Sequence, residues 1–123
     1  MISVLIPSYK RPELLKRALG SLLESSALEN EIIVLTPQPG EEYRRICESA
    51  QATIVDDGSR QNGKRVKGLW QVLNEGIDMA RSPFVCWLND DCTVLKGWDS
   101  IAVSYFEQKD CALVSMRTRP CST

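Results

Sequence analysis

The part of the chain best suited to chemistry is an acidic cluster that directly follows an apolar run. Asn89, Asp90 and Asp91 come after residues 84–88, which read F-V-C-W-L. Carboxylate and amide oxygens are the hard ligands that Mg²⁺ or Mn²⁺ prefers. A metal-assisted phosphate site is therefore our first hypothesis. The alternative is a solvated turn after a strand, which an isolated Asp-Asp pair would favour.

A second polar stretch, residues 56–65, reads D-D-G-S-R-Q-N-G-K-R. Its glycines and polar side chains predict a flexible surface loop. Lys64 and Arg65, together with Lys67, could add positive charge and backbone N–H groups to a bound phosphate. A basic loop of this kind is more often only solvated. Its expected position opposite the acidic cluster leaves both interpretations open.

The residue types that the sequence lacks also limit the chemistry. There is no histidine, so a proton transfer would fall to a carboxylate, a lysine or a tyrosine. The five cysteines show no C-x-x-C spacing, which argues against a zinc site and predicts reduced thiols. No residue up to Thr123 is a convincing catalytic base, so the catalytic residues stay unassigned.

The periodicity of apolar residues predicts the elements that position these groups. Strands are predicted at 2–6, 31–36, 52–55, 84–88 and 111–116, the last running on into residues 117–123. Helices are predicted at 12–25, 41–50 and 66–80, and from Trp98 through Phe106. The apolar run 84–88 indicates a central strand that is buried on both faces. This alternation predicts a three-layer α/β/α fold with a mainly parallel, Rossmann-like sheet.

The polar segments are expected to meet at one edge of that sheet. Residues 7–11, 56–64 and 89–91 each follow a predicted strand. Because parallel strands end on the same side, these segments should lie close together at their carboxyl ends. A topological switch point between such strands forms a crevice that suits a nucleotide.

Length and charge set further limits. With 123 residues the chain is long enough for one domain with a proper core. Fifteen basic and sixteen acidic residues give a net charge of −1, which argues against nucleic acid or an anionic membrane surface as partner. No window approaches the roughly 18 apolar residues of a membrane span, and no basic leader opens the sequence. We therefore expect a cytoplasmic protein without an integral membrane segment.

Four segments, in this order, resemble the family 2 glycosyltransferases of the GT-A fold. They are I-S-V-L-I-P-S-Y-K-R-P-E-L-L-K-R-A-L, E-I-I-V, N-E-G-I-D-M-A and F-V-C-W-L-N-D-D-C. The resemblance implies a nucleoside-diphosphate sugar as donor, with a UDP-type donor expected, and an acceptor that the sequence does not identify. It places Pro7, Ser8, Tyr9 and Arg11 at the nucleotide base and ribose.

The same resemblance assigns the acidic cluster. The family's DXD motif falls on Asn89, Asp90 and Asp91, with Asp91, and Asp90 beside it, holding Mg²⁺ or Mn²⁺ on the donor's diphosphate. The chain departs from the pattern in its first position, where Asn89 stands in place of an Asp. The family's D-D-G-S stretch also follows the third predicted strand here and not the second. We still expect Asp56 or Asp57 at the base-binding edge, because both strands end on the same side.

Three hypotheses follow. The first is a metal-assisted glycosyltransferase, or its donor-binding portion. Family members continue past the DXD strand into an acceptor region with a catalytic base, and residues 1–123 read as one GT-A-like domain that is short on that side. The second is a non-catalytic domain that binds nucleotide sugars; a short chain of either kind could form a homo-oligomer. The third, a nucleotidyltransferase, is disfavoured because P-S-Y stands where its G-G-x-G-T-R loop would be.

Overall fold

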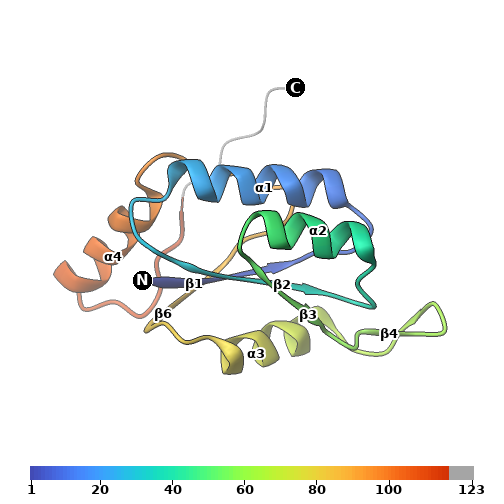
Figure 1. The fold of residues 1–123 in the computed structure, drawn as a ribbon. Helices are drawn as coiled ribbons and strands as arrows, with labels where there is room; N and C mark the ends of the chain where they lie inside the picture. Colours follow the sequence, from blue (N-terminus) through green and yellow to red (C-terminus); the bar gives the residue numbers. More distant parts are fainter. Residues whose placement is uncertain (117–123) are drawn as a thin grey trace.

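A parallel sheet forms the centre of the molecule. The computed structural model describes residues 1–116. Within them the main sheet has the strand order β3-β2-β1-β6, and each neighbouring pair is parallel. Its strands are β1 (Ile2–Pro7), β2 (Glu31–Thr36), β3 (Thr53–Asp56) and β6 (Phe84–Trp87). The central strand β1 lies between β2 and β6 (Figure 1).

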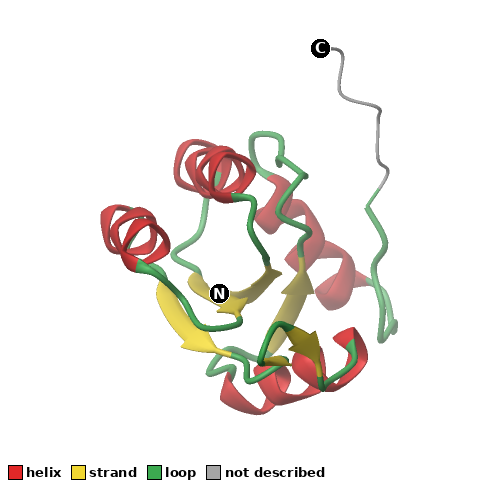
Figure 2. Cartoon of the chain, turned by 90° about the vertical axis from the view of Figure 1, so that its right-hand side faces the viewer, coloured by secondary structure: helices red, strands yellow, loops and turns green. Residues whose placement is uncertain are grey.

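Helices cover both faces of this sheet, as the side view in Figure 2 shows. On one face, α1 (Pro12–Ser25), α2 (Glu41–Ser49) and α4 (Trp98–Gln108) share a core with alternate residues of β1 and β2. On the other face, α3 (Leu69–Met79) packs against Leu5, Ile33 and Leu35. The predicted three-layer α/β/α fold with a mainly parallel sheet is confirmed.

The two cores follow from the alternation of side chains along a strand. In β1, Val4 and Ile6 point toward α1, whereas Leu5 points toward α3, and all three are at most 1% exposed. Helix α3 can approach this closely because of a glycine. A Cβ atom at Gly76 would lie 2.9 Å from Leu35 Cδ1, so a larger residue would have to displace the Leu35 side chain or the helix.

Strand β6 differs from its prediction. The apolar run 84–88 was expected to form a central strand buried on both faces, but in the described part of the chain β6 lies at the sheet edge. Val85 and Trp87 are 40% and 41% exposed. They lie on the α3 side of the sheet, where Trp87 makes an edge-to-face contact with Trp70 of α3 at 5.2 Å between ring centroids. Apolar content alone cannot tell an edge strand from a central one.

Two further predictions were wrong, the start of one helix and the existence of one strand. Helix α3 begins at Leu69 and not at residue 66, because Val66 is still extended and donates its N–H to the carbonyl of Ser59 at 2.7 Å. Residues 111–116 form no strand, although they were predicted as one, and Leu113 is 83% exposed. The rest of that predicted strand, residues 117–123, lies outside the described residues.

The stretch predicted as a flexible loop is a β-hairpin. Strands β4 (Arg60–Gln61) and β5 (Lys64–Arg65) pair antiparallel and extend away from the main sheet (Figure 1). The turn residues Asn62 and Gly63 have φ of 51° and 76°. Asn-Gly with positive φ at both positions is the preferred two-residue hairpin turn. The Asn62-Gly63 dipeptide is therefore the signal from which the hairpin was predictable.

Among residues 1–116, no helix combines the length and the apolar character that crossing a membrane requires.

Candidate nucleotide site

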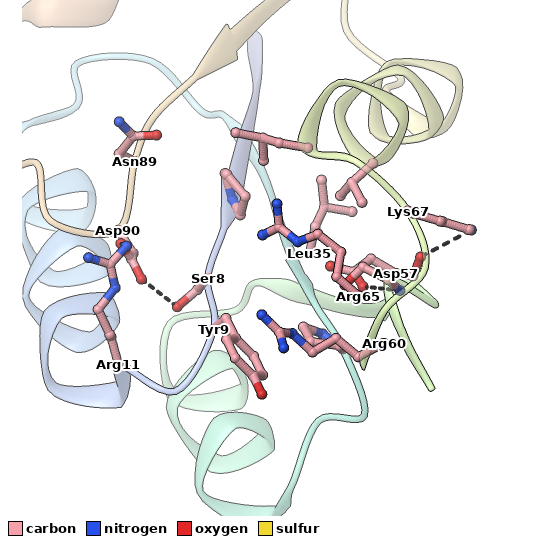
Figure 3. A pocket seen from close by; sticks show the side chains of 15 residues that line it. Ser8, Tyr9, Arg11, Leu35, Asp57, Arg60, Arg65, Lys67, Asn89 and Asp90 are labelled. Atoms are coloured by element: carbon pink, nitrogen blue, oxygen red, sulfur yellow. Dashed lines mark hydrogen bonds and ion pairs between the residues drawn. The ribbon is translucent and has the colours of Figure 1, made fainter. Parts of the chain in front are cut away.

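A cavity of about 200 Å³ lies at the carboxyl edge of the sheet. Segments that are far apart in the sequence form its wall, and Figure 3 shows them facing one another. The lining residues are Pro7, Ser8, Tyr9, Arg11, Leu35, Pro37, Asp57, Ser59, Arg60, Arg65, Lys67, Leu69, Val72, Asn89 and Asp90. The structure thus places an opening where the sequence predicts the polar strand ends to meet.

Most of the predicted site residues come together in this wall, but three do not. Asp56, Lys64 and Asp91 are exposed and are not among the residues that line the cavity. Asp56 ends β3, where its Oδ1 accepts the N–H groups of Gly58 and Gln38 at 3.0 and 3.1 Å. These hydrogen bonds lower the pKa of Asp56. Its carboxylate therefore shapes the turn beside the cavity.

Asp90 is buried on the opposite wall and is held by two residues of the loop after β1. Its Oδ2 accepts the hydroxyl hydrogen of Ser8 at 2.8 Å. Its Oδ1 lies 2.7 Å from Nη2 of Arg11, an ion pair in which the Arg11 side chain stays 52% exposed. Within the described residues this oxygen has no partner in hydrogen-bond geometry, so the contact with Arg11 is mainly electrostatic.

Tyr43 of α2 completes this network, and its role was not predicted from the sequence. Its hydroxyl oxygen accepts the backbone N–H of Arg11 at 2.9 Å and lies 2.9 Å from Ser8 Oγ. Because Ser8 gives its only hydroxyl hydrogen to Asp90, Tyr43 is the donor in the contact with Ser8. A chain of hydrogen bonds therefore runs from Arg11 through Tyr43 and Ser8 to Asp90. The signal was a lone aromatic residue in a helix that otherwise reads as exposed.

Asp57 is buried at the joint end of β2 and β3. Its N–H donates to the carbonyl of Thr36 at 3.1 Å, and its Oδ1 accepts the N–H of Ser59 at 2.8 Å. The parallel register pairs Asp56 with Thr36, so the carboxyl ends of both strands lie side by side. This is the geometry that places the D-D-G-S stretch at the same edge as the end of β2.

Tyr9 connects the loop after β1 to the hairpin. The guanidinium carbon of Arg60 lies 4.1 Å from the centroid of the Tyr9 ring, and Lys10 Nζ lies 5.3 Å from it. Both distances are within the range of cation–π interactions. The hairpin is thereby held against the wall of the cavity.

The acidic cluster offers a metal ion only one or two protein ligands. Within residues 1–116, no three carboxylate, thiol or imidazole groups are arranged around a common metal position. Mg²⁺ is often held by one or two carboxylates, with the remaining positions taken by substrate phosphates and water. The exposed carboxylate of Asp91 fits this pattern. Asp90 fits it less well, because its oxygens already contact Ser8 and Arg11.

Comparison with known proteins identifies the family. The sequence model described as glycosyl transferase family 2 matches residues 3–123. An uncharacterized protein of Mycobacterium tuberculosis is 30% identical over 99 residues, which cover 79% of this chain and 30% of that protein. The GalNAc(5)-diNAcBac-PP-undecaprenol beta-1,3-glucosyltransferase of Campylobacter jejuni is 29% identical over 98 residues, or 78% and 31% of the two chains. The chain spans about 30% of the length of these curated relatives.

Solved structures share the fold. S. aureus TarS 1-349 in complex with UDP-GlcNAc has a TM-score of 0.70 at 17% identity, covering 98% of this chain and 37% of that one. The mannosyltransferase PcManGT of Pyrobaculum calidifontis, in complex with GDP-Man and Mn²⁺, has a TM-score of 0.58 at 21% identity, covering 75% and 28%. These likenesses show the GT-A, Rossmann-like fold.

The match of the family model over residues 3–123 agrees with the order of the motifs and with the parallel fold. This chain belongs to glycosyl transferase family 2.

Proposed function

We propose that residues 1–123 form one GT-A-like donor-binding domain of a glycosyltransferase, which binds a nucleoside-diphosphate sugar in the cavity at the carboxyl edge. The observation that carries this proposal is the convergence of Tyr9, Asp57 and Asn89 on one opening from three separate strand ends. The complexes of TarS with UDP and UDP-GlcNAc, and of PcManGT with GDP-Man, support a nucleotide donor of this class.

The base and ribose occupy the end of the cavity between the β1 loop and the end of β3. Pro7 and Tyr9 offer an apolar ring and an aromatic face, and Ser8, whose hydroxyl is engaged by Asp90 and Tyr43, positions the loop between them. The carboxylate of Asp57 can accept an N–H group, and the imino group of a pyrimidine base supplies one. A UDP-type donor therefore suits this end of the cavity.

We assign the reacting end of the donor to the acidic cluster, of which Asn89 and Asp90 line the cavity and Asp91 does not. Asp91 would hold Mg²⁺ or Mn²⁺, whereas the amide oxygen of Asn89 accepts the indole N–H of Trp87 at 2.9 Å. When bound, the metal neutralises charge on the departing diphosphate. Arg11 and Ser8 fix the buried carboxylate of Asp90 and so set the course of the loop on which Asn89 and Asp91 lie. The acceptor stays unassigned, and we propose a cytoplasmic location, which suits the free thiols of Cys47, Cys86 and Cys111.

A second candidate function is donor binding without transfer. Both carboxylates that line the cavity already have internal partners: Asp57 accepts from Ser59, and Asp90 contacts Ser8 and Arg11. Asp90 is occupied by these contacts, and Asp57 is assigned to the nucleotide base, so neither is assigned to take a proton from an acceptor hydroxyl. A binding-only domain would bind the donor and show no turnover with any acceptor.

Calorimetric titration with UDP, GDP and dTDP, each with and without Mn²⁺, tests the proposal. We expect one of the three to bind, and Asp57→Asn to weaken that binding roughly tenfold or more. Asp78→Asn, an exposed carboxylate on α3, is the matched control and should bind as the wild type does. If none of the three diphosphates binds, the proposal is wrong. Slow hydrolysis of the matching nucleotide sugar would favour transfer over binding alone.

A further inference from the structure

The hairpin carries two arginines directly opposite each other. The register of β4 and β5 pairs Arg60 with Arg65, and Gln61 with Lys64. Residues opposite each other in an antiparallel pair project from the same face, with Cβ atoms about 5 Å apart. Like charges in such a pair destabilise the hairpin. A local cost of this kind points to a functional role for the pair.

The other cations of the cavity are already neutralised. Arg11 forms its ion pair with Asp90 at 2.7 Å. Lys67 binds the carboxylate of Glu75 at 3.0 Å and the carbonyl of Asp57 at 3.1 Å, and Figure 3 shows its side chain pointing away from the opening. The positive charge that remains at the cavity therefore comes from the hairpin.

Neither hairpin arginine has an acidic partner within residues 1–116. Arg60 stacks on Tyr9 and reaches only the carbonyl of Gly63, at 3.4 Å. No ion pair joins Arg65 to any described residue. The guanidinium groups of both extend from the hairpin toward the loop that carries Ser8 and Tyr9 (Figure 3). Two unpaired guanidinium groups thus line one wall of the cavity, across from Asn89 and Asp90.

We propose that Arg60 and Arg65 form a diphosphate-binding subsite that holds the nucleotide donor in the absence of a metal. This inference rests on the proposed function, because it assigns the two phosphates of the same donor. Guanidinium groups bind phosphate oxygens in pairs and keep their charge at any physiological pH. A diphosphate brings enough negative charge to relieve the repulsion between both arginines. A metal at Asp91 then contributes less to binding than to the departure of the diphosphate.

The subsite replaces the assignment of Lys64 and Lys67 to the phosphates. Lys64 is next to Arg65, and successive side chains of a strand point to opposite faces. Its ammonium group is therefore on the far side of the hairpin from Arg65. Lys67 is in the wall, but its charge is cancelled by Glu75.

Binding of UDP and UMP, and in parallel of GDP and GMP, in EDTA tests the inference by calorimetry. We expect the wild type to bind the diphosphate roughly tenfold or more tightly than the monophosphate. Arg60→Gln and Arg65→Gln should each remove most of this preference, and the double variant should remove it completely. Lys64→Gln should lose less than Arg65→Gln, and Arg45→Gln, an exposed arginine of α2, should match the wild type.

Two outcomes would overturn the subsite. One is a double variant that keeps the preference for the diphosphate, and the other is a wild type that binds the diphosphate only with Mn²⁺. In both cases nucleoside-diphosphate binding, and with it the proposed function, would stand. If no nucleoside diphosphate binds under any condition, both proposals fail. Thermal melting provides the folding check: because like charges face each other, Arg65→Gln should not lower the melting temperature.

Discussion

Two buried aspartates, one that lines the cavity and one that does not, differ in their hydrogen-bond partners. Asp90, at the cavity, is 1% exposed, and Asp99, at the start of α4, is 0% exposed. Asp99 accepts four hydrogen bonds: from the N–H groups of Ala27 and Leu28 at 2.9 and 2.8 Å, from Asn30 Nδ2 at 2.8 Å and from its neighbour Ser100 at 2.9 Å. Asp90 instead has one hydroxyl and one half-exposed arginine.

The difference separates a structural carboxylate from one at a binding site. The donors to Asp99 are mostly backbone groups, which cannot turn away, so they fix α4 to the connection between α1 and β2. Burial by itself would raise the pKa of Asp99, but these hydrogen bonds lower it by more. The partners of Asp90 are side chains that can rearrange when a ligand arrives. Equal burial therefore does not mean an equal role.

The largest effect is expected for Asp99→Asn. Asn keeps one acceptor oxygen, but its NH₂ group would face two of the four donors, which would lose their acceptor. We expect a loss of about 2–4 kcal/mol in the free energy of unfolding, measured by urea denaturation. Asp78→Asn, the exposed control, should stay within about 0.5 kcal/mol of the wild type. A loss at Asp99 no larger than that of the control would contradict the structural role.

The structural role of Asp99 should also appear in the pH dependence of the free energy of unfolding. Because the pKa of Asp99 is lowered on folding, the unfolded chain binds its proton more readily than the native state does. The stability from Asp99 is therefore present above its unfolded pKa of about 4, and it is lost as the pH falls through the lower folded value. For Glu31, burial raises the pKa, but hydrogen bonds from Arg81 and Ser3 and the charge of Arg81 lower it by more, so its contribution to stability is also lost as the pH falls.

The decisive quantity is thus the difference between the wild type and Asp99→Asn. Urea denaturation between pH 7 and pH 3 should give a difference that is constant at neutral pH and shrinks below about pH 4. A difference that grows toward low pH would mean that the folded pKa is raised.

A smaller loss in the free energy of unfolding is expected for variants of the Arg11–Asp90 ion pair. The loss should be larger when Arg11 is replaced than when Asp90 is replaced. Arg11→Gln leaves the buried carboxylate of Asp90 without its cation, at a cost of about 1–3 kcal/mol. Asp90→Asn leaves Arg11 solvated, because half of its side chain is exposed, and should cost about 1 kcal/mol or less. A double-mutant cycle by urea denaturation should give a coupling of about 0.5–1 kcal/mol. An Asp90→Asn variant as unstable as Asp99→Asn would erase the contrast between the two carboxylates.

Local patterns in the sequence predicted most of the elements. Pro12 and the apolar spacing that follows it predicted α1 with the bounds that the structure has, because helix starts and amphipathic stripes are local signals. The exposure of Val85 and Trp87 was not predictable in the same way. It depends on whether another strand lies beside β6, which is a tertiary fact.

Some residues of the candidate site were likewise predictable from local sequence, and others were not. Pro7, Ser8 and Tyr9 were predicted because they follow a strand, and they line the cavity. Tyr43 was missed because its partners, Ser8 and Arg11, are more than 30 residues away in the sequence. No spacing rule connects residues that meet only through the packing of α2 beside the β1 loop.

The sequence by itself determined the family and the parallel α/β fold, because the periodicity and the motif order are local properties of the chain. It could not determine how adjacent residues of the same type would divide their roles. Asp90 and Asp91 are neighbours, yet one is buried against Arg11 and the other is exposed. Arg60 and Arg65 face each other only because a hairpin sets their register. Tertiary structure decided these matters, since burial and charge pairing depend on groups brought together from distant parts of the chain.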